Sequence, residues 1–214
     1  MAKRKPLQID IITIFPEMVM PYLSGSILGR GVKSGALKFG VHQLRKWTTD
    51  KHQKVDDKPF GGGPGMVMSV QPFDKALKAL KLKKKSRVIL TSAQGKVFSQ
   101  ADAKRLAKYD RLVFLCGRYE GVDERVAEHL ADEELSIGDY VLTGGELAAL
   151  VMADAISRHV PGVLGKGESL EEVHGSFPQY TRPEVYKKWK VPAVLMSGNH
   201  AKIEEWRKSQ QKKV

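Results

Sequence analysis

The chain has 214 residues, with 36 lysines and arginines against 24 aspartates and glutamates, which gives a formal net charge of +12. A hydrophobic fraction of 42% and a charged fraction of 28% allow a buried core in a soluble chain, so one large domain, or one domain with a small appendage, is expected. A globular domain this basic commonly binds a polyanion, most often nucleic acid, although a merely solubilising surface has the same composition.

The single cysteine, Cys116, excludes a disulfide within the chain and a zinc site built from cysteines. The N-terminus is basic but lacks a long apolar region followed by a cleavage site, so no signal peptide is expected. The longest apolar stretch, residues 147–156, is interrupted by Asp154 and is too short to cross a membrane. We therefore expect a cytoplasmic protein without a membrane segment.

The predicted elements alternate between strands and helices along the chain. Apolar and β-branched runs predict strands at residues 8–15, 36–44, 87–91 and 112–116. Apolar spacing and start signals predict helices at 71–84, 99–109, 122–130 and 146–159, the second opened by a capping box of Ser99 and Asp102. Residues 48–65 are polar and then glycine-rich, which predicts a long loop. The alternation is typical of an α/β domain with a largely parallel sheet.

Three loops are candidate ligand-binding segments, because parallel sheets bind ligands beyond the carboxyl ends of their strands. These loops cover residues 91–95, 115–123 and 136–146. Gly144 and Gly145 lie at a predicted helix start, where we expect their backbone N–H groups to be free to meet a ligand.

The glycine-rich run at residues 61–65 does not match a nucleotide-binding motif. No Gly-Lys-Ser/Thr follows it, and no strand–GxGxxG–helix unit occurs, which disfavours ATP hydrolysis and dinucleotide binding. Asp56, Asp57 and Lys58 precede the run. The segment is therefore either a flexible turn or a binding loop that closes over a ligand.

Asp154 and Arg158 lie four residues apart on a predicted helix that is apolar almost all round and should be buried. They form either a structural ion pair at the helix end or a unit in which Asp154 orients a guanidinium into a site.

The segment 165–180 is acidic within a basic protein. It is either a solvated loop or the source of a general base, for which Glu168, Glu171, Glu172 and His174 are the candidates. No pair of histidines has the spacing of helical metal ligands, so no metal site is expected.

Lysines and arginines gather in two clusters. One contains Lys78, Lys81, Lys83, Lys84, Lys85 and Arg87; the other contains Lys187, Lys188, Lys190, Lys202, Arg207, Lys208, Lys212 and Lys213. Such clusters are usually solvated faces, but Trp189 and Trp206 lie within the second one, which favours a nucleic-acid contact with phosphates on the lysines.

Six stretches of the chain together resemble the bacterial tRNA (guanine-N1)-methyltransferase family, which modifies the guanine just 3′ of the anticodon, position 37. In the family's order they read IDIITIFPEM, VDDKPFGGGPGM, LCGRYEGVDERV, SIGDYVLTGGELAALVMADAISRHVPGVLG, QYTRPEVY and VPAVLMSGNHAKIEEWR. They run from residue 9 to residue 207, and several are long and nearly uninterrupted.

The resemblance implies a knotted α/β fold of the SPOUT class, with a mostly parallel sheet flanked by helices, and a homodimer. It implies a knotted cofactor-binding domain at 1–164, an interdomain loop at 165–180, and a helical tRNA-binding segment at 181–214, which is shorter than usual for the family.

The resemblance also implies that S-adenosylmethionine binds in a bent shape in the knot loops. The corresponding positions here are Leu90, Ser92, Gly117, Glu120, Ile137, Gly138, Asp139, Tyr140, Val141, Leu142, Gly144 and Gly145. Ala93 stands where the family usually has proline, so this loop is expected to be less rigid.

For the RNA substrate, the resemblance assigns binding to Asp57, Lys58, Phe60, Gly61, Gly62 and Gly63. A base must take the proton from guanine N1 while a cation meets the charge that develops on O6. Arg158 matches the family's arginine for this role, with Asp154 beside it.

The family's catalytic aspartate is not matched. Val173 or Gly175 stands at its position, depending on the direction of counting, so we expect Glu172 to be the base, with Glu171 and His174 as alternatives. Nearby acidic residues leave Mg²⁺ open as a second cofactor. A SPOUT methyltransferase for another RNA base and a non-catalytic RNA-binding homologue are the competing interpretations.

Overall fold

The computed structural model describes residues 5–164 and 177–211. The chain divides into two compact units, Met1–Leu164 and Gly165–Val214. Within the described parts, no helix has the length and apolar character needed to cross a membrane.

The first unit contains a five-stranded sheet. Its strands are β1 (Leu7–Thr13), β2 (Leu37–Gln43), β5 (Ser86–Val97), β6 (Arg111–Cys116) and β7 (Glu133–Ser136). Their order is β2-β1-β6-β5-β7, and every neighbouring pair is parallel. The expected α/β class with a parallel sheet is therefore confirmed, and the carboxyl ends of the strands meet at one edge.

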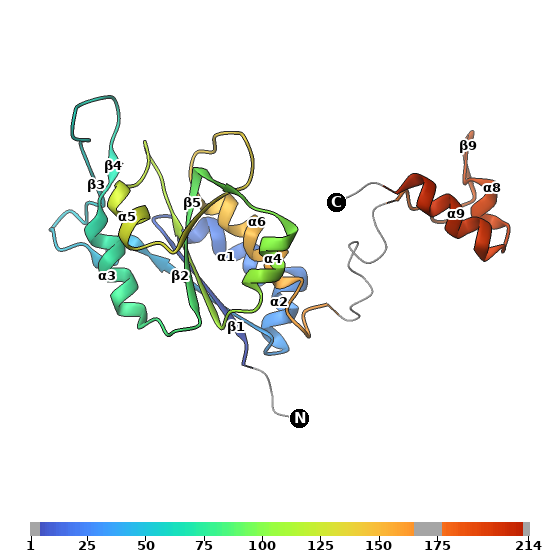
Figure 1. Ribbon diagram of the computed structural model, residues 1–214, viewed down its shortest axis with the longest axis horizontal. Coiled ribbons are helices and arrows are strands. Elements are labelled where there is room, and N and C mark those ends of the chain that lie inside the picture. Colours follow the sequence, from blue (N-terminus) through green and yellow to red (C-terminus); the bar gives the residue numbers. More distant parts are fainter. Residues whose placement is uncertain (1–4, 165–176, 212–214) are drawn as a thin grey trace. The chain divides into compact units, whose positions relative to one another are not determined.

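Helices cover both faces of this sheet (Figure 1). One face carries α1 (Pro16–Ser24), α2 (Ser26–Lys33), α4 (Gln100–Leu106) and α6 (Glu146–Ser157). The other carries the 3-10 helix η1 (Leu44–Trp47), α3 (Val70–Leu80) and α5 (Glu124–His129). Strand residues alternate between the two cores: in β6, Phe114 packs on the first face and Leu115 on the second.

Several elements differ from the sequence-based expectation. Pro16 opens helix α1, because a proline in the first helical turn needs no N–H partner, and the sequence interpretation missed both α1 and α2. Helix α3 ends at Leu80 and not at residue 84, because Lys81 adopts a left-handed conformation with φ of 50°. The expected loop at 48–65 contains β3 (Asp56–Asp57), which pairs antiparallel with β4 (Val67–Met68).

Strand β7 was also not expected, since it has only four residues and two of them are acidic. It pairs with β5, and its residue Glu133 accepts hydrogen bonds from Arg87 at 2.8 Å and from Arg105 at 2.7 Å. Burial raises the pKa of Glu133, but the two guanidinium groups outweigh this effect and hold the pKa below its ordinary value. The predicted capping box is confirmed, with the Ser99 N–H donating to Asp102 at 3.1 Å.

The described part of the second unit contains a hairpin of β8 (Val185–Tyr186) and β9 (Trp189–Lys190), followed by helices α8 (Ala193–Met196) and α9 (His200–Gln210). Asn199 caps α9 by accepting a hydrogen bond from the Lys202 N–H at 3.2 Å. Neither of these two helices contains a buried residue.

Candidate active site

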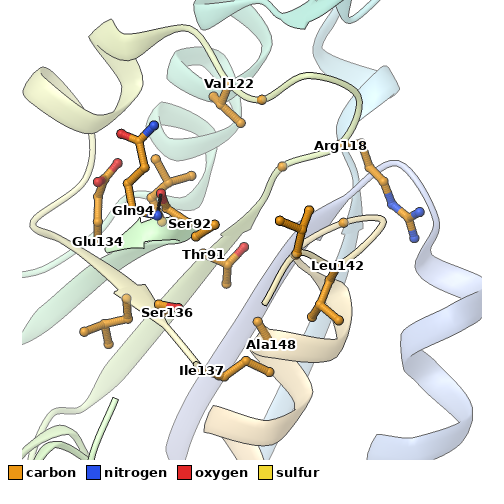
Figure 2. Close-up of a pocket in the computed structure, with 18 of the residues that line it drawn as sticks. Thr91, Ser92, Gln94, Arg118, Val122, Glu134, Ser136, Ile137, Leu142 and Ala148 are labelled. Atoms are coloured by element: carbon orange, nitrogen blue, oxygen red, sulfur yellow. Dashed lines mark hydrogen bonds between the residues drawn. The ribbon is translucent and has the colours of Figure 1, made fainter. Parts of the chain in front are cut away.

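A cavity of about 300 Å³ lies where a segment of β5 meets the segments that follow β6 and β7 (Figure 2). It is lined by residues 90–94 of β5, by the segment after β6, and by the segment after β7. Eleven predicted cofactor positions line it: Leu90, Ser92, Gly117, Glu120, Ile137, Gly138, Tyr140, Val141, Leu142, Gly144 and Gly145. Ala93 lines it as well, whereas Asp139 lies outside the lining.

The segment from β5 leaves the regular sheet at the cavity. The pairing of β5 with β7 shifts its register between Thr91 and Lys96, which frees the residues between them to face the cavity. The Thr91 hydroxyl donates to the Leu115 carbonyl at 3.0 Å and ties this segment to β6. This segment of β5 and the end of β6 therefore form one wall of the cavity.

Gly145 joins the second and third segments. Its N–H donates to the Gly117 carbonyl at 2.9 Å, so the expectation of a free N–H at this residue was wrong. A Cβ on Gly145 would collide with the Thr91 hydroxyl and would lie 3.0 Å from Cα of Cys116. Glycine is required here by close packing, since its φ of −80° is open to any residue.

A buried ionic group supports the cavity from the α1 side. Glu146 is 1% exposed; it accepts hydrogen bonds from the Thr13 hydroxyl at 2.6 Å and from Nε of Arg118 at 3.0 Å. Arg118 also donates to the Thr143 carbonyl at 3.1 Å and lies 4.8 Å above the Phe15 ring. These contacts connect β1 with the loops that follow β6 and β7, and the sequence interpretation assigned no role to Thr13, Arg118 or Glu146.

Three carboxylates line the cavity, and Figure 2 shows one of them, Glu134, on the side away from Arg118. Glu120, Glu124 and Glu134 all belong to the lining. Burial, and secondly the negative charge of Glu124, raise the pKa of Glu134. An acidic wall favours a ligand that carries positive charge or hydroxyl donors. Of these three residues, only Glu120 was predicted.

The glycine-rich loop is tied to the cavity at its base. The Glu120 N–H donates to the Met66 carbonyl at 3.0 Å, and the Met68 N–H donates to the Gly121 carbonyl at 2.9 Å. The predicted substrate residues lie outside the cavity lining. Asp57 ends β3 at this base, whereas the others lie on the loop that projects between β3 and β4 (Figure 1); they are Lys58, Phe60, Gly61, Gly62 and Gly63. Phe60 is fully exposed, which is unusual for a phenylalanine without a partner.

Asp154 and Arg158 lie toward the far end of α6 from the cavity. Asp154 accepts a hydrogen bond from the Tyr22 hydroxyl at 2.8 Å, and the described residues show no ion pair between Asp154 and Arg158. The structural ion pair considered from the sequence is therefore absent. The expected burial of α6 holds for eight of its twelve residues, but Leu147 is 55% and Val151 49% exposed.

Glu172, the expected general base, lies outside the described residues. The other candidates, Glu168, Glu171 and His174, lie outside them as well. Among the residues that the structure describes, no group of three or more histidine, cysteine, aspartate or glutamate side chains is arranged to hold a metal ion.

The fold and the cavity define an α/β domain with a cavity of ligand size where segments of β5, β6 and β7 converge. The sequence profile described as tRNA (Guanine-1)-methyltransferase TrmD matches residues 7–214. The chain belongs to this family.

Curated relatives agree with this assignment. A tRNA (guanine-N(1)-)-methyltransferase of Heliobacterium modesticaldum is 49% identical over 95% of this chain and 80% of its own length. Proteins of the same name from Geobacter metallireducens and Ruminiclostridium cellulolyticum are 50% and 49% identical, over 94% and 95% of this chain and 85% and 91% of their own lengths.

Proposed function

We propose that this protein transfers a methyl group from S-adenosylmethionine to N1 of the guanine 3′ to the anticodon, position 37, in tRNA. The observation that carries the proposal is the cavity, in which segments from three strands bring together eleven positions that the resemblance assigns to the cofactor. The net charge of +12 suits a tRNA substrate.

The cavity residues fit S-adenosylmethionine. Its volume of about 300 Å³ lies at the lower end of the range for cofactor sites. Leu90, Ile137 and Leu142 offer apolar contacts for a purine ring, and the carboxylates of Glu120 and Glu134 suit ribose hydroxyls and positive charge. When bound, this cofactor supplies a methyl group on a positively charged sulfur, already activated for transfer.

The remaining chemistry concerns the guanine. Guanine N1 carries a proton and becomes a good nucleophile only as that proton leaves, when negative charge spreads to O6. We assign Arg158 to meet this charge, with Asp154 beside it on α6, and Glu172 to accept the proton. Removal of a preorganised donor of this kind typically costs about 100- to 1000-fold in rate. The Arg158→Ala variant should therefore retain cofactor binding in a calorimetric titration but lose single-turnover methylation.

We further propose that the working unit is a homodimer. Arg158 lies 13 residues beyond Gly145, and a helix rises 1.5 Å per residue, so about 20 Å separates it from the cavity of its own subunit. The side of α6 that the subunit leaves open carries Leu147 and Val151, followed at helical spacing by Asp154 and Arg158. Two such helices packed antiparallel about a two-fold axis would place Arg158 of each subunit at the cavity of the other.

Other exposed apolar side chains extend this surface. Met18 of α1 is 48% exposed and lies one turn before Tyr22, which is 52% exposed and donates its hydroxyl to Asp154 of α6. Val141 at the cavity rim is 88% exposed. Exposed apolar side chains next to α6 suit a subunit interface. The same interface would bury the exposed stripe of α6.

We also propose the trefoil knot of the SPOUT class around the cavity and a cytoplasmic location. The Gly145–Gly117 hydrogen bond and the position of β5 between β6 and β7 support the knot, because β6 and β7 follow each other in the sequence but are separated in the sheet by the earlier strand β5. The loop at residues 57–63, fixed at its base to the cavity, is then placed to close over the guanine.

A further inference from the structure

The β8–β9 hairpin of the second unit carries two aromatic rings and three lysines within six residues. Tyr186 and Trp189 are direct cross-strand partners, so their rings lie on the same face, with centroids 5.6 Å apart and planes inclined at 44°. Lys187, at the turn with φ of 57°, places its ammonium 5.5 Å from the Tyr186 ring and 6.0 Å from the Trp189 ring.

These rings do not serve as a core within the described part of their unit. Trp189 is 69% and Tyr186 55% exposed, whereas Trp206 of α9 is half-buried and packs against the Tyr180 ring at 6.2 Å. Burial of an aromatic side chain is strongly favourable, so two adjacent exposed rings indicate a surface that another molecule covers.

The charge around the rings indicates what kind of molecule this is. Lys187, Lys188 and Lys190 give the hairpin three positive charges, and the nearest acidic residue in sequence is Glu184 at its base. A subunit interface usually excludes lysine from its centre, whereas single-stranded nucleic acid matches lysines with phosphates and aromatic rings with bases.

We propose that the β8–β9 hairpin binds an unpaired nucleotide of the tRNA, with its base stacked on Trp189 and in contact with the tilted ring of Tyr186, and the flanking phosphates on Lys187 and Lys188. The inference rests on the proposed function in taking tRNA as the RNA. It adds a contact in the second unit, separate from the guanine that reacts at the cavity of the first.

Stacking and charge make different predictions for tRNA affinity. Trp189→Ala and Tyr186→Ala should each weaken equilibrium binding by about 5- to 100-fold, because a base loses its stacking partner, with the salt dependence kept. Trp189→Phe should restore most of the affinity. Lys187→Gln and Lys188→Gln each remove one positive charge from neighbouring positions. Each should lower by about one the slope of log affinity for tRNA against log salt concentration.

The measurement is equilibrium binding of labelled tRNA to the full chain at several salt concentrations, with S-adenosylmethionine titrations confirming that each variant keeps an intact cavity. Unchanged tRNA affinity of Trp189→Ala would overturn the proposal. So would dissociation of Trp189→Ala dimers in sedimentation experiments, since the hairpin would then be a subunit contact.

This experiment separates the inference from the proposed function, because binding is measured without methyl transfer. If the wild-type protein methylates tRNA and Trp189→Ala binds tRNA with unchanged affinity, the hairpin contact alone is contradicted. A wild-type protein that binds tRNA through Trp189, but transfers no methyl group, supports the hairpin contact and contradicts the proposed function.

Discussion

At the scale of single residues, the cavity depends on positions such as Gly145, where a Cβ atom would have no room. Gly145 was identified from the sequence because glycines before a helix are conspicuous. Its contact with Thr91 could not be identified in that way, because 54 residues separate the two. The bond between Thr13 and Glu146 joins residues 133 apart, and nothing in the sequence pairs them. Local sequence signals thus revealed the glycines and missed their ionic support.

Gly145→Ala should strongly impair cofactor binding. The added methyl group collides with the Thr91 hydroxyl and crowds the backbone at Cys116, so the cavity walls must move apart. Overpacking of this kind costs about 1–3 kcal/mol, equivalent to roughly 5- to 150-fold in affinity if it falls on the bound state. Calorimetry with S-adenosylmethionine measures the effect. Gly25→Ala is the matched control, since a Cβ there meets only carbonyl oxygens at 3.6 Å.

Glu134 should make cofactor affinity depend on pH. Because burial and Glu124 raise its pKa, Glu134 takes up a proton at a higher pH than an ordinary glutamate, and the negative charge facing a cationic ligand is lost as pH falls. Affinity should therefore rise with pH through this raised pKa, and Glu134→Gln should remove the dependence. Titrations from about pH 5 to pH 8 test this, and an identical profile for both proteins would count against it.

The same shift has the opposite sign for stability. The folded chain holds the Glu134 proton to a higher pH than the unfolded chain, so this residue's contribution to the free energy of unfolding decreases as pH rises between the two pKa values.

At the scale of elements, the helix at Glu146–Ser157 was predicted within two residues, because its apolar run is long and glycines mark its start. Strand β7 was missed because four residues carry too little periodicity, and its position follows from its pairing with β5. Helices α1 and α2 were missed because Pro16 was taken only as the end of a strand.

Glu146→Gln should loosen the junction of β1, α6 and the Arg118 loop. Removing one charge leaves Arg118 without its buried carboxylate partner, and breaking a buried pair typically costs about 3 kcal/mol. Urea unfolding measures this loss. The control is Asp74→Asn, which removes the exposed Lys78–Asp74 pair and should cost less than about 0.5 kcal/mol. Equal effects of the two substitutions would contradict the supporting role of Glu146.

At the scale of the whole molecule, part of the first lysine cluster lies away from the cavity. Lys83, Lys84 and Lys85 precede β5, which begins at Ser86, so they lie at the amino edge of the sheet, opposite the cavity. Arg87 of the same cluster is engaged with Glu133. The sequence could not show which edge a basic run occupies, because strand direction and sheet order are set by tertiary pairing.

A heterodimer tests whether the site is shared between subunits. One subunit carries Arg158→Ala and the other Gly145→Ala, and the two are co-expressed with different tags and purified through both. If Arg158 acts on the partner's cavity, one of the two sites is intact, and about half of the wild-type activity should appear at a cofactor concentration too low to fill the Gly145→Ala cavity, where each homodimer shows little activity. A heterodimer as inactive as both homodimers would place Arg158 and the cavity it serves in the same subunit.

The central claim is methylation of guanine N1 next to the anticodon, and nucleoside mass spectrometry tests it most directly. The purified protein is incubated with S-adenosylmethionine and tRNA transcripts that carry either guanine or adenine immediately 3′ of the anticodon. We predict 1-methylguanosine at that position in the first transcript and no methylated nucleoside in the second. Methylation of another base, or no product from a protein that binds both ligands, would contradict the claim.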